Sequence, residues 1–537
     1  MSIASKKYVP EPQPQFGPIE ISAFYYPGTE QMAEWDQVEQ TLPHIKPLLG
    51  WYDEGNPEVI DWQIKWAVEH GISSFCVDWY WNRGVQRLDH WVKGYYRARY
   101  RKYLKWYMMW ANHNEVGAHS TEDQVAVTKF WIDNYFKTPE YYCIDNRPVV
   151  VIWAIENLDR DFIREAAAKG ETLQPGEGVK RALEISNKLV RAAGLPDIYF
   201  IDMYRARDFD QKKIDIAKSC GYEAQMIYNF STLGYSLVPE AAKPGDTPTH
   251  FSYDCVVKAI SKWWEMTSRD PEFPLWPLVP TGWNDVPRSF QHARIIKDRT
   301  PEKFRRICES CRSFCEAKGF KRIIIAPLNE WQEGSYIEPN QEFGFAMYDA
   351  LRDVFCDKPA QGWPPNITPE DIGLGPYDYP KMPHLAQTAW DFSNDMQGWY
   401  RHPYGTAYMK TVDSAMRFFR SGVKVPAIRT RITPFAAANF KSFQFRMRVT
   451  PCADNPPKGG EETKLYWGTT ELPIFSKDFV ITEDPTAKTA LIPDGQWHDY
   501  VLDLTANPHW RGMVDELWFD PVPLSLAYVD IKWMRFV

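Results

Sequence analysis

Short apolar runs alternate with amphipathic stretches between residues 19 and 355 of the chain. The amphipathic stretches carry apolar residues at helical spacing, as in Pro57–His70, Thr121–Phe136, Gly178–Ala193 and Pro301–Lys318. The apolar runs have the length and the turn-rich borders of buried strands, and they are Ile19–Tyr26, Ile72–Trp79, Leu104–Asn112, Pro148–Ile155, Ile198–Tyr204, Glu223–Phe230, Leu275–Trp283 and Arg322–Asn329. Eight strand-then-helix units predict an α/β fold, a (β/α)8 or TIM barrel.

An open, doubly wound sheet is the alternative arrangement of such units. No Gly-rich phosphate loop follows any of the apolar runs, which disfavours that alternative. Nearly every run ends in polar or aromatic residues, among them Tyr25-Tyr26, Asp78-Trp79, Asn112-His113, Trp283-Asn284-Asp285 and Asn329-Glu330. Because the catalytic groups of such barrels sit at the C-terminal strand ends, these segments are predicted to form one functional rim.

The sequence pattern changes after the eighth strand-and-helix unit. Residues 357–389 are Pro-rich and unpatterned, which predicts a linker that is partly ordered against the barrel. Residues 390–537 hold short alternating segments separated by Gly, Pro, Asn and Asp, which predicts an all-β sandwich or jelly roll. We therefore expect an N-terminal extension over 1–18, a barrel over 19–356, the linker and the C-terminal sandwich.

Composition narrows the class of function. The chain has 537 residues, a net charge of −8 and a pI near 5.9, which argues against a nucleic-acid partner. Aromatic residues make up 15% of the chain, and flat rings beside polar clusters suit sugars, whose C–H faces stack on rings while their hydroxyls take hydrogen bonds. No apolar run is long enough to span a membrane, and the N-terminal segment lacks the apolar core of a signal peptide.

The segment Asn329-Glu330-Trp331-Gln332-Glu333-Gly334 places two carboxylates three residues apart directly after the last apolar run. In a continuing strand they would point to opposite faces, whereas a turn or a helix start brings their Cβ atoms to within ~5–6 Å. Two acids this close do not ionise independently, so one is driven towards its protonated form and an acid stands beside a base. Glu330 and Glu333 are therefore predicted to be catalytic, the alternative being that they only cap the next helix.

Sequence motifs for metal ions or other catalytic machinery are absent. There is no His-Glu-x-x-His segment, no acidic calcium loop and no Gly-x-Ser-x-Gly elbow. Cys308, Cys311 and Cys315 fall at helical spacing in an amphipathic pattern, which predicts burial in the core and not a metal cluster. We expect an enzyme without a cofactor or a metal.

The barrel sequence resembles a known family at five strand ends. The segments that carry the resemblance are Ala23–Pro27, Phe75–Trp81 with Arg83-Gly84, Trp110–Asn114, Gly282–Arg288 and Asn329–Pro339. They are similar to glycoside hydrolase family 99, and in particular to its WbsX-like relatives, over most of residues 20–355. In the tail, Trp390-Asp391-Phe392 and Gly495–His498 resemble jelly-roll carbohydrate-binding modules, which either bind sugar or buttress a catalytic barrel.

This resemblance implies that Glu330 and Glu333 are the catalytic pair of a retaining glycoside hydrolase. In that family the first glutamate removes the proton of the sugar 2-hydroxyl, whose oxygen closes on the anomeric carbon to give a 1,2-anhydro sugar. The second glutamate protonates the leaving oxygen and then activates water. Neither carboxylate has to reach the anomeric carbon, so two acids on one turn suffice, whereas an ordinary retaining pair flanks the bond ~5–5.5 Å apart.

Four residues after the second and third strands are candidates for contacts to the substrate. Asp78, next to Trp79, is predicted to accept hydrogen bonds from sugar hydroxyls, with a salt bridge inside the barrel as the alternative. Asn112 and His113 are predicted to hold a hydroxyl or to orient Glu330, and the alternative is that His113 is a satisfied structural histidine.

The seventh strand end adds four more candidates. Trp283 is predicted to stack on a sugar ring, and Asn284 and Asp285 to make polar contacts. Arg288 is predicted either to hold an anionic substituent or, as we favour, to pair with Asp285. The floor of the pocket is predicted to be lined by Tyr25, Tyr26 and Trp331.

These observations favour a retaining glycoside hydrolase that acts on a complex polysaccharide or oligosaccharide. A glycosyltransferase of polysaccharide biosynthesis and a non-catalytic glycan-binding protein are the alternatives. We expect a periplasmic or secreted location, because polymers are degraded there, with a cytoplasmic location as the alternative. The long segment Ser231–Pro274 after the sixth strand is expected to be a loop that walls off one end of the cleft or packs elsewhere.

Overall fold

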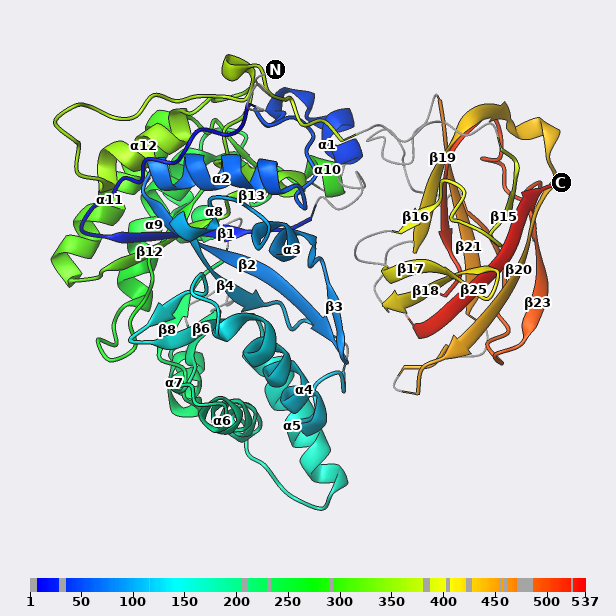
Figure 1. Cartoon of the computed structure of the whole chain (residues 1–537), viewed down its shortest axis with the longest axis horizontal. Helices are drawn as coiled ribbons and strands as arrows, with labels where there is room; N and C mark the ends of the chain where they lie inside the picture. The colour runs from blue at the N-terminus through cyan, green and yellow to red at the C-terminus, as the bar shows by residue number, and fades with distance from the viewer. Residues whose placement is uncertain are drawn as a thin grey trace, which may run out of the picture. The chain divides into compact units, whose positions relative to one another are not determined.

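The computed structural model describes the chain apart from residues 1–6, 29–34, 115, 204–209, 229–232, 290–292, 380–386, 402–405, 422–426, 454, 458–460, 471–485 and 523–524. It divides into two compact units, Met1–Tyr379 and Pro380–Val537 (Figure 1). Helices surround a parallel sheet in the first unit, and the second unit is built from antiparallel strands.

Parallel strands form a barrel wall in the hydrogen-bonded order β10-β12-β1-β2-β4-β6-β7-β8. These strands are β1 (Glu20–Tyr25), β2 (Ile72–Asn82), β4 (Lys105–Trp110), β6 (Arg147–Ile152), β7 (Tyr199–Met203), β8 (Ala224–Met226), β10 (Leu278–Pro280) and β12 (Arg322–Ala326). The wall closes where Gln225 of β8 forms a parallel bridge with Leu275, just before β10. The predicted (β/α)8 barrel is confirmed, because each predicted run overlaps one wall strand.

Helices follow the wall strands on the outside of the barrel. The longer ones are α2 (Pro57–Glu69), α4 (Thr121–Trp131), α5 (Ile155–Ala168), α6 (Glu177–Ala192), α7 (Gln211–Cys220), α9 (Tyr253–Thr267), α11 (Pro301–Lys318) and α12 (Ala346–Phe355). The helix α9 lies in the segment that we expected to be a loop, and its N-cap Ser252 accepts a hydrogen bond from the backbone of Asp254. Among the described residues no helix is long and apolar enough to cross a membrane.

Both ends of the barrel unit pack on the barrel. In the extension, the Tyr8 hydroxyl donates to Asp61 at 2.6 Å. In the predicted linker, the backbone N–H groups of Tyr377 and Tyr379 donate to carbonyls of the segment before α2, at 2.7 and 2.6 Å. Most of the linker therefore belongs to the barrel unit, which ends at Tyr379.

The second unit is a β-sandwich, as predicted. One sheet has the order β17-β18-β25-β20-β23, with β15 on β25, and the other has the order β16-β19-β24-β21-β22. The strands are β15 (Ala389–Asp391), β16 (Tyr400–Arg401), β17 (Thr406–Val412), β18 (Ala415–Ser421), β19 (Ile428–Ala436), β20 (Ser442–Pro451), β21 (Glu462–Thr469), β22 (Thr486–Ala490), β23 (Trp497–Asp503), β24 (Met513–Asp520) and β25 (Leu526–Phe536). The two sheets share one core, in which Phe445 packs on Phe519 at 5.0 Å between ring centroids. Trp390 and Trp399 are buried in this core.

Candidate functional site

The motif after β12 folds into a tight turn. Asn329–Glu330 form the short strand β13, Trp331–Glu333 form a 3-10 turn, and Ser335–Tyr336 return as β14. In a 3-10 turn, side chains three residues apart lie on one side, so Glu330 and Glu333 become neighbours, as the sequence predicted. Gly334 ends the turn with φ +56°, a conformation that favours glycine.

Backbone and side-chain bonds tie this turn to two other strand ends. Asn329 accepts from the Tyr26 N–H and donates to the Tyr26 carbonyl, both at 2.9 Å, which joins the turn to the end of β1. The Asn284 N–H donates to the Glu333 carbonyl at 2.6 Å, which joins it to the segment after β10. The turn is therefore held on one side by the end of β1 and on the other by the segment after β10. These are the two strands that flank β12 in the wall.

Three carboxylates from two strand ends gather at this turn. Asp78 near the end of β2 is 5% exposed and Glu330 is 6% exposed. Burial, together with the negative charges of Glu330 and Glu333, raises the pKa of Asp78 well above its usual range. Burial and then the charge of Glu330 also raise the pKa of Glu333 well above its usual range. One turn thus holds acids that cannot all be ionised together.

A tyrosine connects two of these acids. The Tyr228 hydroxyl, from the segment after β8, donates to Glu330 Oε1 at 2.5 Å. The same hydroxyl offsets part of the rise in the pKa of Asp78. A hydrogen bond to a carboxylate favours its charged form, so the bond from Tyr228 favours an ionised Glu330.

Arg288 forms an ion pair with Glu333. We expected Asp285 as its partner, whereas Asp285 accepts from the Arg294 N–H at 2.5 Å and from the Ser289 hydroxyl at 2.9 Å. The positive charge of Arg288 lowers the pKa of Glu333, but burial is the larger effect and the net shift is upwards. The side chain of Arg288 is 45% exposed and that of Glu333 is 13% exposed, so the pair lies at the mouth of the site.

A row of aromatic rings leads outwards from Tyr228. Phe24 lies 4.9 Å and Trp153 lies 5.2 Å from the Tyr228 ring. The exposed His113 packs edge-on against Trp153 at 6.2 Å and against Tyr80 at 6.0 Å. With Tyr228 included, these rings come from five different strand ends and offer flat apolar surface that reaches Glu330 through Tyr228.

Three of the predicted contact residues have rings that are buried against other aromatic rings. The Tyr25 ring packs on Trp91 at 4.8 Å between α3 (His90–Tyr95) and the wall. Trp79 is 1% exposed and packs against Trp131 of α4. Trp331 is 2% exposed and stacks on Tyr336 at 4.5 Å. Strand alternation sends neighbouring side chains to opposite faces, so two adjacent aromatics at one strand end do not both face the site.

Asn112 joins two strand ends. Its side-chain amide donates to the Ala154 carbonyl at 2.8 Å, and its carbonyl oxygen accepts from the Ala154 N–H at 2.7 Å. It is fully buried. In this arrangement Asn112 positions the loop that carries Trp153, a role that the sequence analysis did not assign to it.

Trp283 and Asn284 line a cavity of about 380 Å³ together with Gly334 and Tyr336. The Trp283 indole N–H has no hydrogen-bond partner among the described residues. Asn284 accepts from the Val286 N–H at 3.3 Å, which shapes the segment after β10. The structure thus brings Trp283 and Asn284 to the turn that holds Glu333.

The sequence analysis did not single out Tyr228. It lies inside the sixth predicted run, but β8 ends at Met226, so Tyr228 occupies a strand-end position. The same rule that selected the other strand ends would have selected this residue, had the short length of β8 been known.

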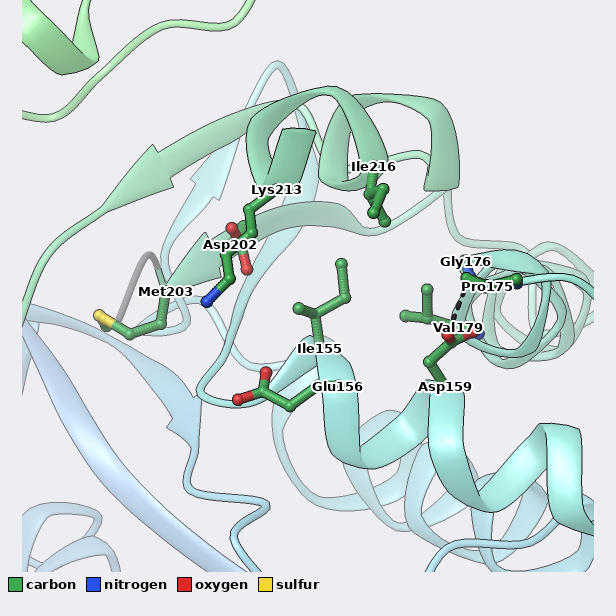
Figure 2. Close-up of a pocket in the computed structure, with 10 residues that line it drawn as sticks. All are labelled: Ile155, Glu156, Asp159, Pro175, Gly176, Val179, Asp202, Met203, Lys213 and Ile216. Atoms are coloured by element: carbon green, nitrogen blue, oxygen red, sulfur yellow. Dashed lines mark hydrogen bonds between the residues drawn. The ribbon is translucent and has the colours of Figure 1, made fainter. Parts of the chain in front are cut away.

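A second cavity of about 230 Å³ lies between β7 and the helices α5, α6 and α7 (Figure 2). Asp202 near the end of β7 and Lys213 of α7 lie at one end, and Val179 and Pro175 at the other. Asp202 is 3% exposed, and its Oδ1 atom has no hydrogen-bond partner among the described residues. Burial raises the pKa of Asp202 to about 7, with Lys213 opposing the rise.

Replacement of this acid is expected to change stability with pH. The pKa of Asp202 is about 7 when folded and 3.8 as a reference, so the native state binds more protons between these values and stability falls as pH rises through them. Asp202→Asn should therefore leave the melting temperature unchanged at pH 4 and raise it at pH 8. The free energy of unfolding at pH 8 should increase by up to about 4 kcal/mol. Thermal melts across this range test it, and equal effects at both pH values would contradict it.

Comparison with known proteins places the chain in a family. Residues 14–351 match the model of the family described as glycosyltransferase WbsX. The chain therefore belongs to the WbsX family, and the match spans the barrel.

The individual proteins that match the chain share low sequence identity with it. The uncharacterised protein WxcX of Xanthomonas campestris pv. campestris is 25% identical over 380 residues, which cover 64% of this chain and 49% of that protein. The chain thus spans about half the length of this relative. Among solved structures, a glycoside hydrolase-like protein is 16% identical with a TM-score of 0.46, covering 66% of this chain and 98% of that chain. The GH99 endo-alpha-mannosidase of Bacteroides thetaiotaomicron is 16% identical with a TM-score of 0.40, covering 62% and 94%.

Proposed function

We propose that this protein is a retaining glycoside hydrolase acting on a complex polysaccharide or oligosaccharide. The observation that carries the proposal is the turn at the end of β12, which holds Glu330 and Glu333 side by side with a raised pKa for Glu333. Environments that separate the ionisation of two neighbouring acids assign one as the acid and the other as the base.

The two glutamates then have distinct roles. Glu330 accepts the hydrogen bond of Tyr228 and acts as the base that removes the proton of the sugar 2-hydroxyl. The freed oxygen attacks the anomeric carbon and forms a 1,2-anhydro sugar as the glycosidic bond breaks. Glu333, whose pKa is raised well above its usual range, gives its proton to the leaving oxygen. The same carboxylate then takes a proton from the water that attacks the anomeric carbon, and Glu330 returns its proton to the 2-oxygen as the anhydro ring opens. Both groups are thereby restored, and the two displacements together give retention.

The other groups around the turn supply binding. Asp78 has an Oδ1 atom without a hydrogen-bond partner among the described residues, and we assign it to the sugar hydroxyls next to the cleaved bond. Trp153 and His113 provide ring surface for the sugar C–H faces. Because polymers are degraded outside the cytoplasm, we also propose a periplasmic or secreted location.

A glycan panel tests this function. We expect the wild-type chain to release reducing sugar from at least one member of a set that contains α-mannosides, pectins, arabinogalactans and bacterial exopolysaccharides. Each glycan is incubated in parallel with nucleotide sugars, because the family description names a glycosyltransferase. Transfer of label from a nucleotide sugar, without release of reducing ends, would favour the transferase and refute the hydrolase.

Removing the charge of Arg288 is expected to shift the pH profile. Arg288 lowers the pKa of Glu333, so Arg288→Gln raises that pKa further. If Glu333 is the general acid, it then stays protonated to higher pH, and the alkaline limb of kcat/KM moves to higher pH. Arg305→Gln, which removes a surface pair with Asp353, is the matched control and should leave the profile unchanged. A shift of the limb to lower pH would contradict the assignment of Glu333.

A further inference from the structure

The outer face of one sandwich sheet carries a cluster of aromatic and charged side chains. In the sheet β17-β18-β25-β20-β23 (Figure 1), Phe418 and Val529 are fully buried in the core. Because side chains alternate along a strand, their neighbours Arg417, Phe419 and Tyr528 belong to the opposite, outer face. Phe419 and Tyr528 are directly opposite each other in the β18–β25 register.

Three rings gather on this face. Tyr528 is 41% exposed, its ring lies 5.1 Å from Phe419, and it lies 6.4 Å from Tyr408 on β17. The ammonium group of Lys410 sits 5.5 Å from the centre of the Tyr408 ring. An exposed tyrosine supported by two further rings is a flat, amphipathic surface on which a sugar ring can stack while its hydroxyls stay in reach of polar groups.

Next to these rings, one carboxylate holds two guanidinium groups. Asp530 is 2% exposed and accepts from Arg417 Nε at 2.6 Å and from Arg448 Nε at 2.9 Å. The Arg448 guanidinium also lies 4.8 Å from the centre of the Trp497 ring. Asp530 contacts the Nε and Nη2 atoms of both arginines. Within the described part of the chain no hydrogen bond from either Nη1 atom is found, so these atoms can donate to a ligand. Arg417 also lies 3.8 Å from the exposed Asp413, and Lys410 stands opposite Arg417 in the β17–β18 register. The three cations and two carboxylates leave this group with one net positive charge.

Charge on the whole face favours an acidic ligand. Its outward positions carry more cations than carboxylates, in a chain whose net charge is −8. The cations are Lys410, Arg417, Arg446, Arg448 and Arg535, and the carboxylates are Asp391, Asp499, Asp503 and Asp530. Planar guanidinium groups match carboxylate and sulfate geometry, and the rings match the apolar faces of pyranoses. The pair Arg417–Asp530 lies two residues along the strands from Phe419–Tyr528, about 6.6 Å away.

We propose that this face binds an acidic glycan. A pyranose ring stacks on Tyr528 with Phe419 and Tyr408 beside it, and the carboxylate of a uronic acid takes hydrogen bonds from Arg417 and Arg448. Asp530 is a positioning residue, which fixes the directions of both guanidinium groups. This binding site stands apart from the catalytic proposal and does not need the barrel to cleave the same glycan.

Affinity electrophoresis of the full chain tests the proposal. The gels contain sodium polygalacturonate, alginate or a neutral galactomannan. We expect an acidic polymer to retard the wild-type chain, and this retardation to weaken as salt is added. The dissociation constant should be at least tenfold higher for Tyr528→Ala and for Arg448→Lys. The lysine variant keeps the positive charge but lacks the planar guanidinium group. Lys488→Ala, on the opposite sheet and 58% exposed in its side chain, is the matched control and should bind like wild type.

Several outcomes would overturn the proposal. Retardation by no acidic polymer, or equal retardation by the neutral galactomannan, would exclude recognition of the acidic group. Retardation that is lost in Glu330→Gln/Glu333→Gln but kept in Tyr528→Ala would place binding in the barrel. Tighter binding to single-stranded oligothymidine than to the acidic polymers would identify a nucleic-acid face. Tyr528 is exposed, so melting temperatures of its variant should match wild type and separate binding from folding.

Discussion

Glu330→Gln and Glu333→Gln are each expected to lower the rate of glycan cleavage by about a hundred- to ten-thousandfold, the usual contribution of a positioned acid or base. Glutamine keeps the size of each side chain but neither removes a proton from the sugar nor gives one to the leaving oxygen. Because both groups serve the same reaction, the double variant should be little slower than the worse single variant. Release of reducing ends from the glycan found in the panel measures these rates.

The control for this experiment is an acid outside the turn. Glu272 is 80% exposed in its side chain and pairs with Lys218, so Glu272→Gln should cleave at the wild-type rate. Melting temperatures of all variants show whether the barrel is intact. Wild-type rates in either Glu330→Gln or Glu333→Gln, with the fold preserved, would show that the turn is not the catalytic centre.

Gly334→Ala is expected to have the second largest effect. Gly334 has φ +56°, and a Cβ atom there would lie 2.6 Å from the Asn284 carbonyl oxygen, far inside contact distance. Strain of the left-handed backbone and this overlap should together cost about 2–4 kcal/mol of unfolding free energy. The turn would shift to relieve the overlap, and cleavage should fall because Glu333 moves with it.

Gly344→Ala is the matched control for Gly334→Ala. Gly344 has a similar φ of +54°, but a Cβ atom there meets nothing within 4 Å. The control therefore carries only the backbone strain, about 1–2 kcal/mol. Denaturant unfolding of both variants gives the difference. If the two variants lose the same stability and keep the same activity, the close packing of Asn284 on the turn does not contribute to stability or to cleavage, and the prediction is wrong.

The barrel was predictable because its strands are buried on both faces. Runs such as Arg322–Asn329 are almost continuously apolar, and their polar ends mark where the chain leaves the core. The turn was predictable from two features, a Gly after the second carboxylate and the end of an apolar run. Alternating short segments in residues 390–537 similarly predicted the sandwich.

Side-chain contacts between residues far apart in the sequence could not be predicted in the same way. The hydrogen bond between Tyr228 and Glu330 joins residues 102 positions apart, and nothing in the sequence near either residue encodes it. Arg288 pairs with Glu333 and not with its neighbour Asp285 because the segment after β10 is bonded to the turn through Asn284. Tyr25 and Trp79 were assigned to the site because they stand at strand ends, but the face that each occupies depends on strand register.

The most direct test of the central claim is the stereochemistry of cleavage. Proton NMR during the first minutes of reaction shows the anomeric configuration of the new reducing end before it equilibrates. The proposed pair of Glu330 as base and Glu333 as acid predicts retention, and predicts that a substrate with a 2-deoxy sugar at the cleaved position is not turned over. An inverted product, or equal turnover of the 2-deoxy substrate, would contradict the account.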